Sequence, residues 1–138
     1  MSLVLDTSFV LAMLDADDRH HERCRLVAET VADDFVLPTL TLAEIDYFLR
    51  REGHDDAWQG FVYDIAAGGY RLHGPDEREL QRAAELEREY DTLRLGIVDA
   101  SVIVACERLG ETKVATLDRR HFSVVRPRHC DALTLLPA

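Results

Sequence analysis

Short apolar runs alternate with stretches of helical periodicity along this chain. Apolar runs bounded by polar or turn residues predict buried strands at 3–5, 35–37, 70–72, 113–116 and 133–136. Between them, apolar positions spaced three or four residues apart predict helices over 8–14, 20–32, 41–53, 56–67, 75–90 and 97–109. Strands that alternate with helices form βαβ units, so we expect an α/β fold with a parallel sheet covered by helices on both faces.

Local signals mark several of the expected helix ends. Thr41-Leu42-Ala43-Glu44 has the spacing of a capping box, in which the Thr and Glu side chains satisfy backbone N–H groups at a helix start. Gly110 follows the helix predicted over 97–109 and is typical of a C-terminal stop. The sequence has no repeat, linker or low-complexity segment. We therefore expect residues 1–138 to form a single domain, which is a usual size for one.

The charge and cysteine content narrow the class of protein. The formal net charge is −10, from 26 acidic and 16 basic residues, which argues against nonspecific nucleic-acid binding. The three cysteines are widely spaced, with no pair at metal-ligand or redox spacing, as is typical of reduced thiols. No signal-peptide pattern is visible, and no apolar run approaches the roughly 20 residues of a membrane span. We therefore expect a cytoplasmic protein without a membrane segment.

Four acids occupy positions that a parallel sheet would bring together. Asp6 ends the first apolar run and Asp118 ends the fourth, while Glu44 and Asp99 fall in the opening turns of two predicted helices. In an open α/β sheet, strand ends and the following helix starts share one edge, where ligands bind. Two unit charges about 4 Å apart repel by on the order of 4 kcal/mol at an effective dielectric of about 20. A hard divalent cation, Mg²⁺ or Mn²⁺, would relieve that repulsion, so the sequence indicates a metal-dependent phosphoryl-transfer site.

Each acid also has a purely structural explanation. Glu44 stands at the third position of the capping box, Asp99 lies where a helix dipole favours negative charge, and Asp118 can cap the short turn at 119–122. Asp6 has no such explanation, because an acid that ends a buried strand needs a partner. All four structural explanations together are less economical than one shared site at the edge where the acids converge.

The residues around these acids form an ordered set of four motifs. They are Leu3-Val4-Leu5-Asp6-Thr7-Ser8, Leu42-Ala43-Glu44-Ile45, Leu95-Gly96-Ile97-Val98-Asp99-Ala100-Ser101 and Ala115-Thr116-Leu117-Asp118-Arg119-Arg120-His121-Phe122. In order and spacing they resemble the motifs of PIN-domain ribonucleases, and in particular the VapC toxins of bacterial toxin–antitoxin pairs, over essentially the whole chain. Many PIN domains carry Thr-x-Asn-x-x-Asp-Phe in the last motif. Here Asp118 stands at the Asn position and His121 at the Asp position.

The resemblance implies a PIN-like doubly wound parallel sheet of four to five strands with helices on both faces. It also implies a homodimer, a VapB-like antitoxin that masks the site, and a Mg²⁺- or Mn²⁺-dependent endoribonuclease acting on structured RNA such as tRNA or rRNA. On this interpretation the metal-binding and catalytic residues are Asp6, Glu44, Asp99 and Asp118. Hydrolysis by a metal-activated water should leave a 5′-phosphate and a 3′-hydroxyl.

Neighbouring side chains are candidates for substrate binding. The hydroxyls of Thr7, Ser8 and Thr116 could orient water or bind phosphate, although turn and helix capping explains them equally well. Arg119 and Arg120 directly follow Asp118, and arginine suits bidentate phosphate contact, so we expect this pair to hold RNA. Three aromatic residues could stack bases but stand at the helical spacing of core residues: Tyr47, Trp58 and Phe61.

Three other functions fit the same motifs. A PIN-type nuclease could act on DNA, or it could process RNA outside a toxin–antitoxin pair. A catalytically idle PIN module that only binds a partner is the third, although the intact set of acids speaks against it.

Overall fold

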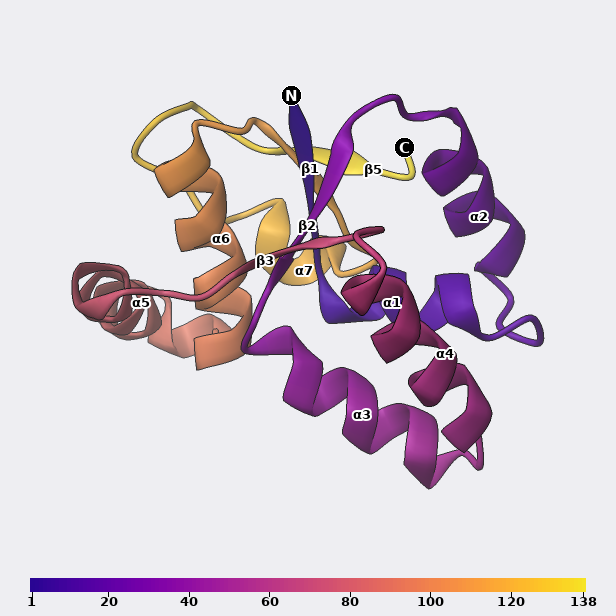
Figure 1. Cartoon of the computed structure of the whole chain (residues 1–138). Coiled ribbons are helices and arrows are strands. Elements are labelled where there is room, and N and C mark those ends of the chain that lie inside the picture. Colours follow the sequence, from indigo (N-terminus) through magenta and orange to yellow (C-terminus); the bar gives the residue numbers. More distant parts are fainter.

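Five parallel strands form the centre of the structure, which is a computed structural model of residues 1–138 (Figure 1). The strand order is β3-β2-β1-β4-β5, so the chain builds outward from β1 in one direction and then crosses back to add two strands on the other side. The strands are β1 (Ser2–Leu5), β2 (Asp34–Pro38), β3 (Arg71–His73), β4 (Lys113–Ala115) and β5 (Thr134–Leu136). The helices are α1 (Thr7–Leu14), α2 (His21–Thr30), α3 (Thr41–Arg51), α4 (Asp55–Ala66), α5 (Glu77–Glu89), α6 (Ile97–Leu109) and α7 (Arg119–Phe122). The doubly wound parallel sheet of the sequence analysis is confirmed.

Each face of the sheet has its own apolar core, because strand side chains point alternately to the two faces. Val4, Val36 and Val114 pack on one face with residues of α5, α6 and α7. Leu3 and Leu5 pack on the other face with residues of α1, α2, α3 and α4. Burial on both faces explains why the strands read as continuous apolar runs rather than as alternating patterns.

Helix α6 carries Asp99 and is deeply buried along most of its length. Every residue from 100 to 106 is buried, so the helix is covered on more than the single apolar face that its spacing indicated. It ends where predicted, at Gly110, whose φ of 69° lies in the left-handed region that glycine adopts without steric cost. This rigid placement fixes the first turn of α6 against the sheet.

The other predicted helices and strands are also present, each within two residues of the predicted bounds. The sequence did not indicate the short 3₁₀ turn at Asp91–Leu93, which precedes α6. None of the helices combines the length and the apolar composition needed to cross a membrane.

The predicted capping box at the start of α3 is wrong. Thr41 is already helical, and its hydroxyl donates to the carbonyl of Pro38 at 2.7 Å. The Oε1 atom of Glu44 accepts a hydrogen bond from the Thr7 hydroxyl at 2.7 Å instead of reaching back to the helix start. The capping explanation for Glu44 therefore falls away, because its carboxylate is directed toward β1 and α1.

The burial of α6 predicts how the fold responds to truncation there. Ile103 is completely buried, so Ile103→Ala should lower the free energy of unfolding by about 2–5 kcal/mol through lost burial and a residual cavity. Ile97 begins the same helix and is 39% exposed, so Ile97→Ala should cost much less. Urea unfolding measures both changes. Equal losses in the two variants would contradict the packing described for α6.

Candidate functional site

The four predicted acids meet at the carboxyl edge of the sheet. Asp6 directly follows β1, and its backbone N–H donates to the Ala115 carbonyl at 2.9 Å, which continues the pairing of β1 with β4. Asp118 follows β4 and starts α7, while Glu44 and Asp99 lie in the first turns of α3 and α6. This edge includes the point between β1 and β4 where the strand order reverses, at which open α/β sheets bind ligands.

Asp6 is held by two hydroxyl groups from neighbouring strand ends. Its side chain is buried, and its Oδ2 atom accepts hydrogen bonds from Thr116 at 2.7 Å and from Ser8 at 2.9 Å. Burial raises the pKa of Asp6, the two hydroxyl bonds oppose that rise, and the charge of Asp118 adds to it. The Thr116 hydroxyl also accepts from the backbone N–H of Asp118 at 3.0 Å. The hydroxyls therefore orient Asp6 and the turn after β4 together.

Glu44 is positioned by the remaining predicted hydroxyl. Thr7 is buried at the start of α1 and donates to Oε1 of Glu44. The contact joins the turn after β1 to the turn after β2, two segments that are distant in the sequence. The other carboxylate oxygen of Glu44, Oε2, has no hydrogen bond within the chain. This oxygen is therefore free to accept a hydrogen bond or to bind a cation at the edge of the sheet.

His121 lies between Asp118 and a backbone carbonyl, a setting that favours its charged form. Its Nδ1 atom lies 2.7 Å from Oδ2 of Asp118, and its Nε2 atom lies 2.6 Å from the carbonyl oxygen of Leu93. Both partners are acceptors, so this geometry favours the protonated ring, in which both nitrogens donate. Burial alone would lower the pKa of His121, but the two hydrogen bonds and the charges of Asp118 and Asp99 raise it. The backbone N–H of His121 also donates to Asp118, which is thus the N-cap of α7 as well as a site acid.

Asp99 is the acid without a donor. It accepts no hydrogen bond within the chain, and its pKa is raised to about 6 by burial and by the charges of Asp6, Asp118 and Glu44, with His121 opposing. Ligand atoms of Asp99, Asp118 and His121 lie within 4.8 Å of one another. A half-buried carboxylate under repulsion from three others is the environment that a divalent cation stabilises, so the oxygen ligands present fit such an ion.

The two arginines of the last motif differ in their surroundings. Arg119 donates from Nη2 to the Pro137 carbonyl at 3.1 Å, which ties α7 to the end of the chain. Arg120 is exposed and makes no hydrogen bond or ion pair within the protein. Of these two arginines, only Arg120 has a guanidinium group that is free to bind a substrate.

Sequence reasoning left out His121, which contacts a candidate site acid, and Arg94, which has an unusual backbone conformation next to the residue that holds His121. His121 was noted only as a substitution in the last motif, and that substitution is the one signal for the contact with Asp118. Arg94 is exposed and is the only non-glycine residue with a positive φ, 57°, beside the Leu93 carbonyl that holds His121. A positive φ at arginine carries a backbone cost and recurs at functional sites, but no pattern in the sequence predicts it.

Comparison with known proteins agrees with the motifs. A model of the PIN domain family matches residues 3–126. Ribonuclease VapC26 of Mycobacterium tuberculosis is 32% identical over 135 residues, which cover 98% of this chain and 100% of that protein.

Solved structures of low sequence identity share the fold. The Mycobacterium tuberculosis VapC20 structure, described as a Sarcin-Ricin loop cleaving toxin, superposes with a TM-score of 0.83 at 18% identity, over 93% of this chain and 98% of that one. The Rickettsia felis VapBC2 structure, bound to a DNA fragment from their promoter, has a TM-score of 0.67 at 16% identity, over 98% of this chain and 97% of that one.

The raised pKa of Asp99 predicts a pH-dependent stability difference. The carboxyl has a pKa of about 6 in the folded protein and an ordinary value of 3.8, so the folded state binds more protons between these values and loses stability as the pH rises. Without divalent ions, Asp99→Asn should match the wild type at about pH 4 and be more stable at about pH 7.5. Urea unfolding in a chelator at both values measures the difference. A difference that does not grow with pH would contradict the repulsion inferred at this site.

Proposed function

Because this chain belongs to the PIN-domain family, we propose that it is a metal-dependent endoribonuclease toxin that is neutralised by a cognate antitoxin. The observation that carries the proposal is the convergence of four carboxylates, one of which, Asp99, has no donor within the protein. The 32% identity to a VapC ribonuclease over nearly the full chain supports the ribonuclease activity. We further propose that residues 1–138 form one PIN domain and that the protein acts in the cytoplasm.

We propose Asp6, Glu44, Asp99 and Asp118 as the residues that hold Mg²⁺ or Mn²⁺, directly or through water. When bound, such an ion supplies a more acidic water nucleophile and neutralises charge on the scissile phosphate. The chain positions these acids through its own hydrogen bonds. Ser8 and Thr116 fix Asp6, Thr7 fixes Glu44, and His121 fixes Asp118, so the carboxylates need little reorganisation to bind a cation.

The substrate proposed is a structured RNA such as tRNA or rRNA, cut by in-line attack of water. Because the 2′-hydroxyl is not the nucleophile, the products should carry a 5′-phosphate and a 3′-hydroxyl. The exposure of Arg120 and its lack of a partner support a role in phosphate contact, and Arg119 could join it by releasing the Pro137 carbonyl. The hydroxyls of Thr7, Ser8 and Thr116 donate to Glu44 or Asp6, and an acid that turns to a bound metal would release its hydroxyl to orient the attacking water.

Loss of a site carboxylate should abolish cleavage without unfolding the protein. We expect Asp99→Asn and Glu44→Gln each to lower RNA cleavage at least about 100-fold, because the charge that a metal ion provides is worth several kcal/mol in the transition state. Glu89→Gln, an exposed acid on α5, should leave the rate unchanged. The assay is cleavage of labelled tRNA and rRNA fragments with and without Mg²⁺, with mapping of the ends formed.

The same assay separates the alternative functions. Cleavage of DNA in place of RNA would favour a DNA-acting PIN nuclease, and cleavage by Asp99→Asn at the wild-type rate would remove Asp99 from the site. A wild type that cuts neither polymer in Mg²⁺ or Mn²⁺ would favour an idle module. A wild type whose unfolding temperature is unchanged by these ions would contradict the metal site.

We propose that the antitoxin masks the site by placing an Arg or Lys among the four carboxylates, since a cationic side chain can replace part of the cation's charge. An apolar groove beside the site could take the rest of the partner. It has a volume of about 380 Å³ and is lined by residues of α3 and α4 and by one of β3, namely Leu42, Ala43, Asp46, Trp58, Val62, Ile65 and Leu72. An amphipathic segment laid in such a groove is a common mode of peptide recognition.

Antitoxin binding should therefore compete with divalent ions. We expect the wild type to be poorly tolerated when expressed alone and tolerated with its antitoxin, and excess Mg²⁺ to weaken the complex measurably. Asp99→Asn expressed alone is the control and should be harmless. If wild type and Asp99→Asn are equally harmless, the toxin proposal fails. The homodimer stays a prediction, which light scattering of the purified chain can measure.

A further inference from the structure

The exposed face of α3 continues away from the carboxylates. Residues three and seven positions apart lie on the same side of a helix, so Tyr47 and Arg51 share a face with Glu44. At 1.5 Å per residue they lie about 4.5 Å and about 10.5 Å further along the helix axis. Figure 1 shows α3 leading from the carboxyl ends of the strands toward the lower edge of the view. A ligand held at Glu44 can therefore extend along this face.

Tyr47 is an aromatic ring open to solvent on that face. It is 60% exposed, whereas Phe61 is buried and Trp58 packs against the core, so of the three aromatic candidates only Tyr47 is available for stacking. Phe48 meets it edge-on with ring centroids 5.3 Å apart, and the guanidinium of Arg51 lies 5.7 Å from the Tyr47 centroid. The ring is thus supported on the protein side while most of its surface is free.

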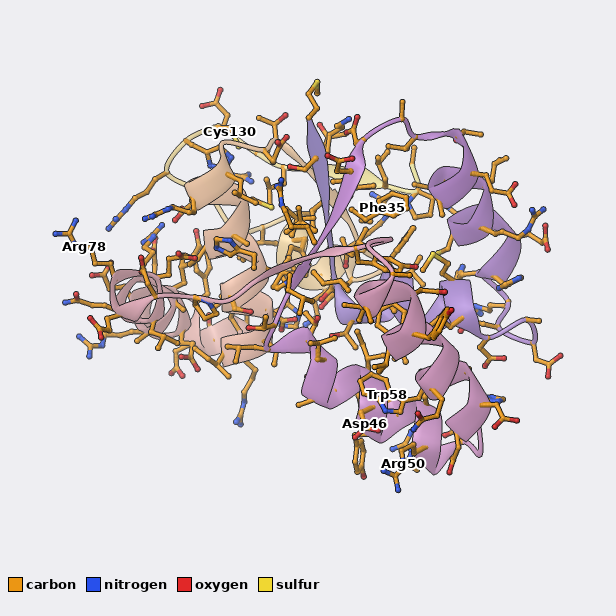
Figure 2. The ribbon with its side chains drawn as sticks, viewed as in Figure 1. Phe35, Asp46, Arg50, Trp58, Arg78 and Cys130 are labelled. Carbon is orange, nitrogen blue, oxygen red and sulfur yellow. The ribbon has the colours of Figure 1, made fainter.

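Two arginines beside Tyr47 are weakly held. A hollow of about 440 Å³ is lined by Asp46, Tyr47, Arg50 and Arg51, and Figure 2 shows Asp46 and Arg50 at the lower edge of the molecule. Arg50 is 3.9 Å from Asp46, and Arg51 is 3.3 Å from Glu52. Arg50, Arg51 and Glu52 are exposed and Asp46 is half-buried, and the contact between Arg50 and Asp46 is too long for a hydrogen bond. Such pairs contribute little, so a phosphate can replace the carboxylates at small cost.

We propose that Tyr47, Arg50 and Arg51 bind a single-stranded segment of the RNA next to the cleaved bond. Tyr47 stacks on a base, and the arginines contact phosphates. The inference rests on the proposed ribonuclease function and names the part of the protein that receives the substrate beyond the carboxylates.

Charge favours RNA over a protein at this surface. A polyanion approaching four carboxylates on a chain of net charge −10 is repelled unless cations lie close to the site. Arg119 and Arg120 follow Asp118 on α7, and Arg50 and Arg51 lie two turns beyond Glu44 on α3, so arginine pairs are available on two separate helices. Arg50 and Arg51 attract phosphate groups, so the basic side chain proposed for the antitoxin would bind at the acids and not at this end of α3.

The test measures RNA binding and cleavage separately. Binding is followed by fluorescence anisotropy with a labelled single-stranded RNA of about 12 nucleotides, in the Asp99→Asn background so that the probe survives. Tyr47→Ala should weaken binding about 5- to 100-fold, and Tyr47→Phe should restore it, because stacking needs only the ring. Tyr63→Ala is the matched control, since Tyr63 is 74% exposed on the neighbouring helix α4. In the otherwise wild-type enzyme, Tyr47→Ala should raise KM more than it lowers kcat.

The contribution of the arginines to RNA binding is measured from the salt dependence of the affinity. Arg50→Ala should reduce the slope of log affinity against log salt by about 0.7, the value for one phosphate contact to a single strand. Arg78→Ala is the control, because Arg78 is exposed on α5 at the opposite side of the molecule (Figure 2).

The outcomes separate this inference from the proposed function. If the wild type cuts RNA but Tyr47→Ala binds and cuts like its parent, the inference is overturned while the ribonuclease function stands. If Tyr47→Ala weakens only the antitoxin complex, the surface is a protein interface and the RNA assignment is wrong. A wild type that neither binds nor cuts any RNA overturns the proposed function itself.

Discussion

Repulsion among four carboxylates at one edge of the sheet is the constraint on which the rest of the structure depends. The protein offsets it with donors placed on individual acids, as Thr116 does on Asp6 and His121 does on Asp118. Asp99 accepts no hydrogen bond from such a donor. Its pKa is raised by burial and by the repulsion that remains between it and the other acids. The folded state therefore gives up stability to keep these acids together, and a cation bound beside Asp99 would lower that cost.

The order of the strands explains how so few residues can build this arrangement. β1 and β4 are adjacent, so the turn that carries Asp6 and Ser8 meets the turn that carries Thr116 and Asp118. Each segment supplies both an acid and a hydroxyl, and within each segment the two residues are joined by a hydrogen bond. β2 lies on the other side of β1 and adds the start of α3. The connection from β3 to β4 contains α6, and the first turn of α6 brings Asp99 to the same edge.

Sequence reasoning predicted the elements and the meeting point of the acids because both depend on spacing. The bounds of α6 follow from an apolar pattern with a glycine stop, and the convergence of the acids follows from parallel strand topology. Spacing does not determine which donor a polar side chain chooses. Glu44 matched a capping box locally, yet Thr7 from a distant turn binds it. Tyr47 and Phe61 both stand at helical spacing, and only the packing of α4 against α3 decides which ring is buried.

The acids lie on segments spread across almost the whole chain, and this has a consequence during synthesis. Asp118 follows β4, and β4 must pair with β1 before Asp118 can approach Asp6. Such long-range pairing forms late, after local helices. A chain still held by the ribosome, with its last strands inside, therefore has no assembled carboxylate cluster. The carboxylate cluster of such a chain is completed only after its last strands have left the ribosome.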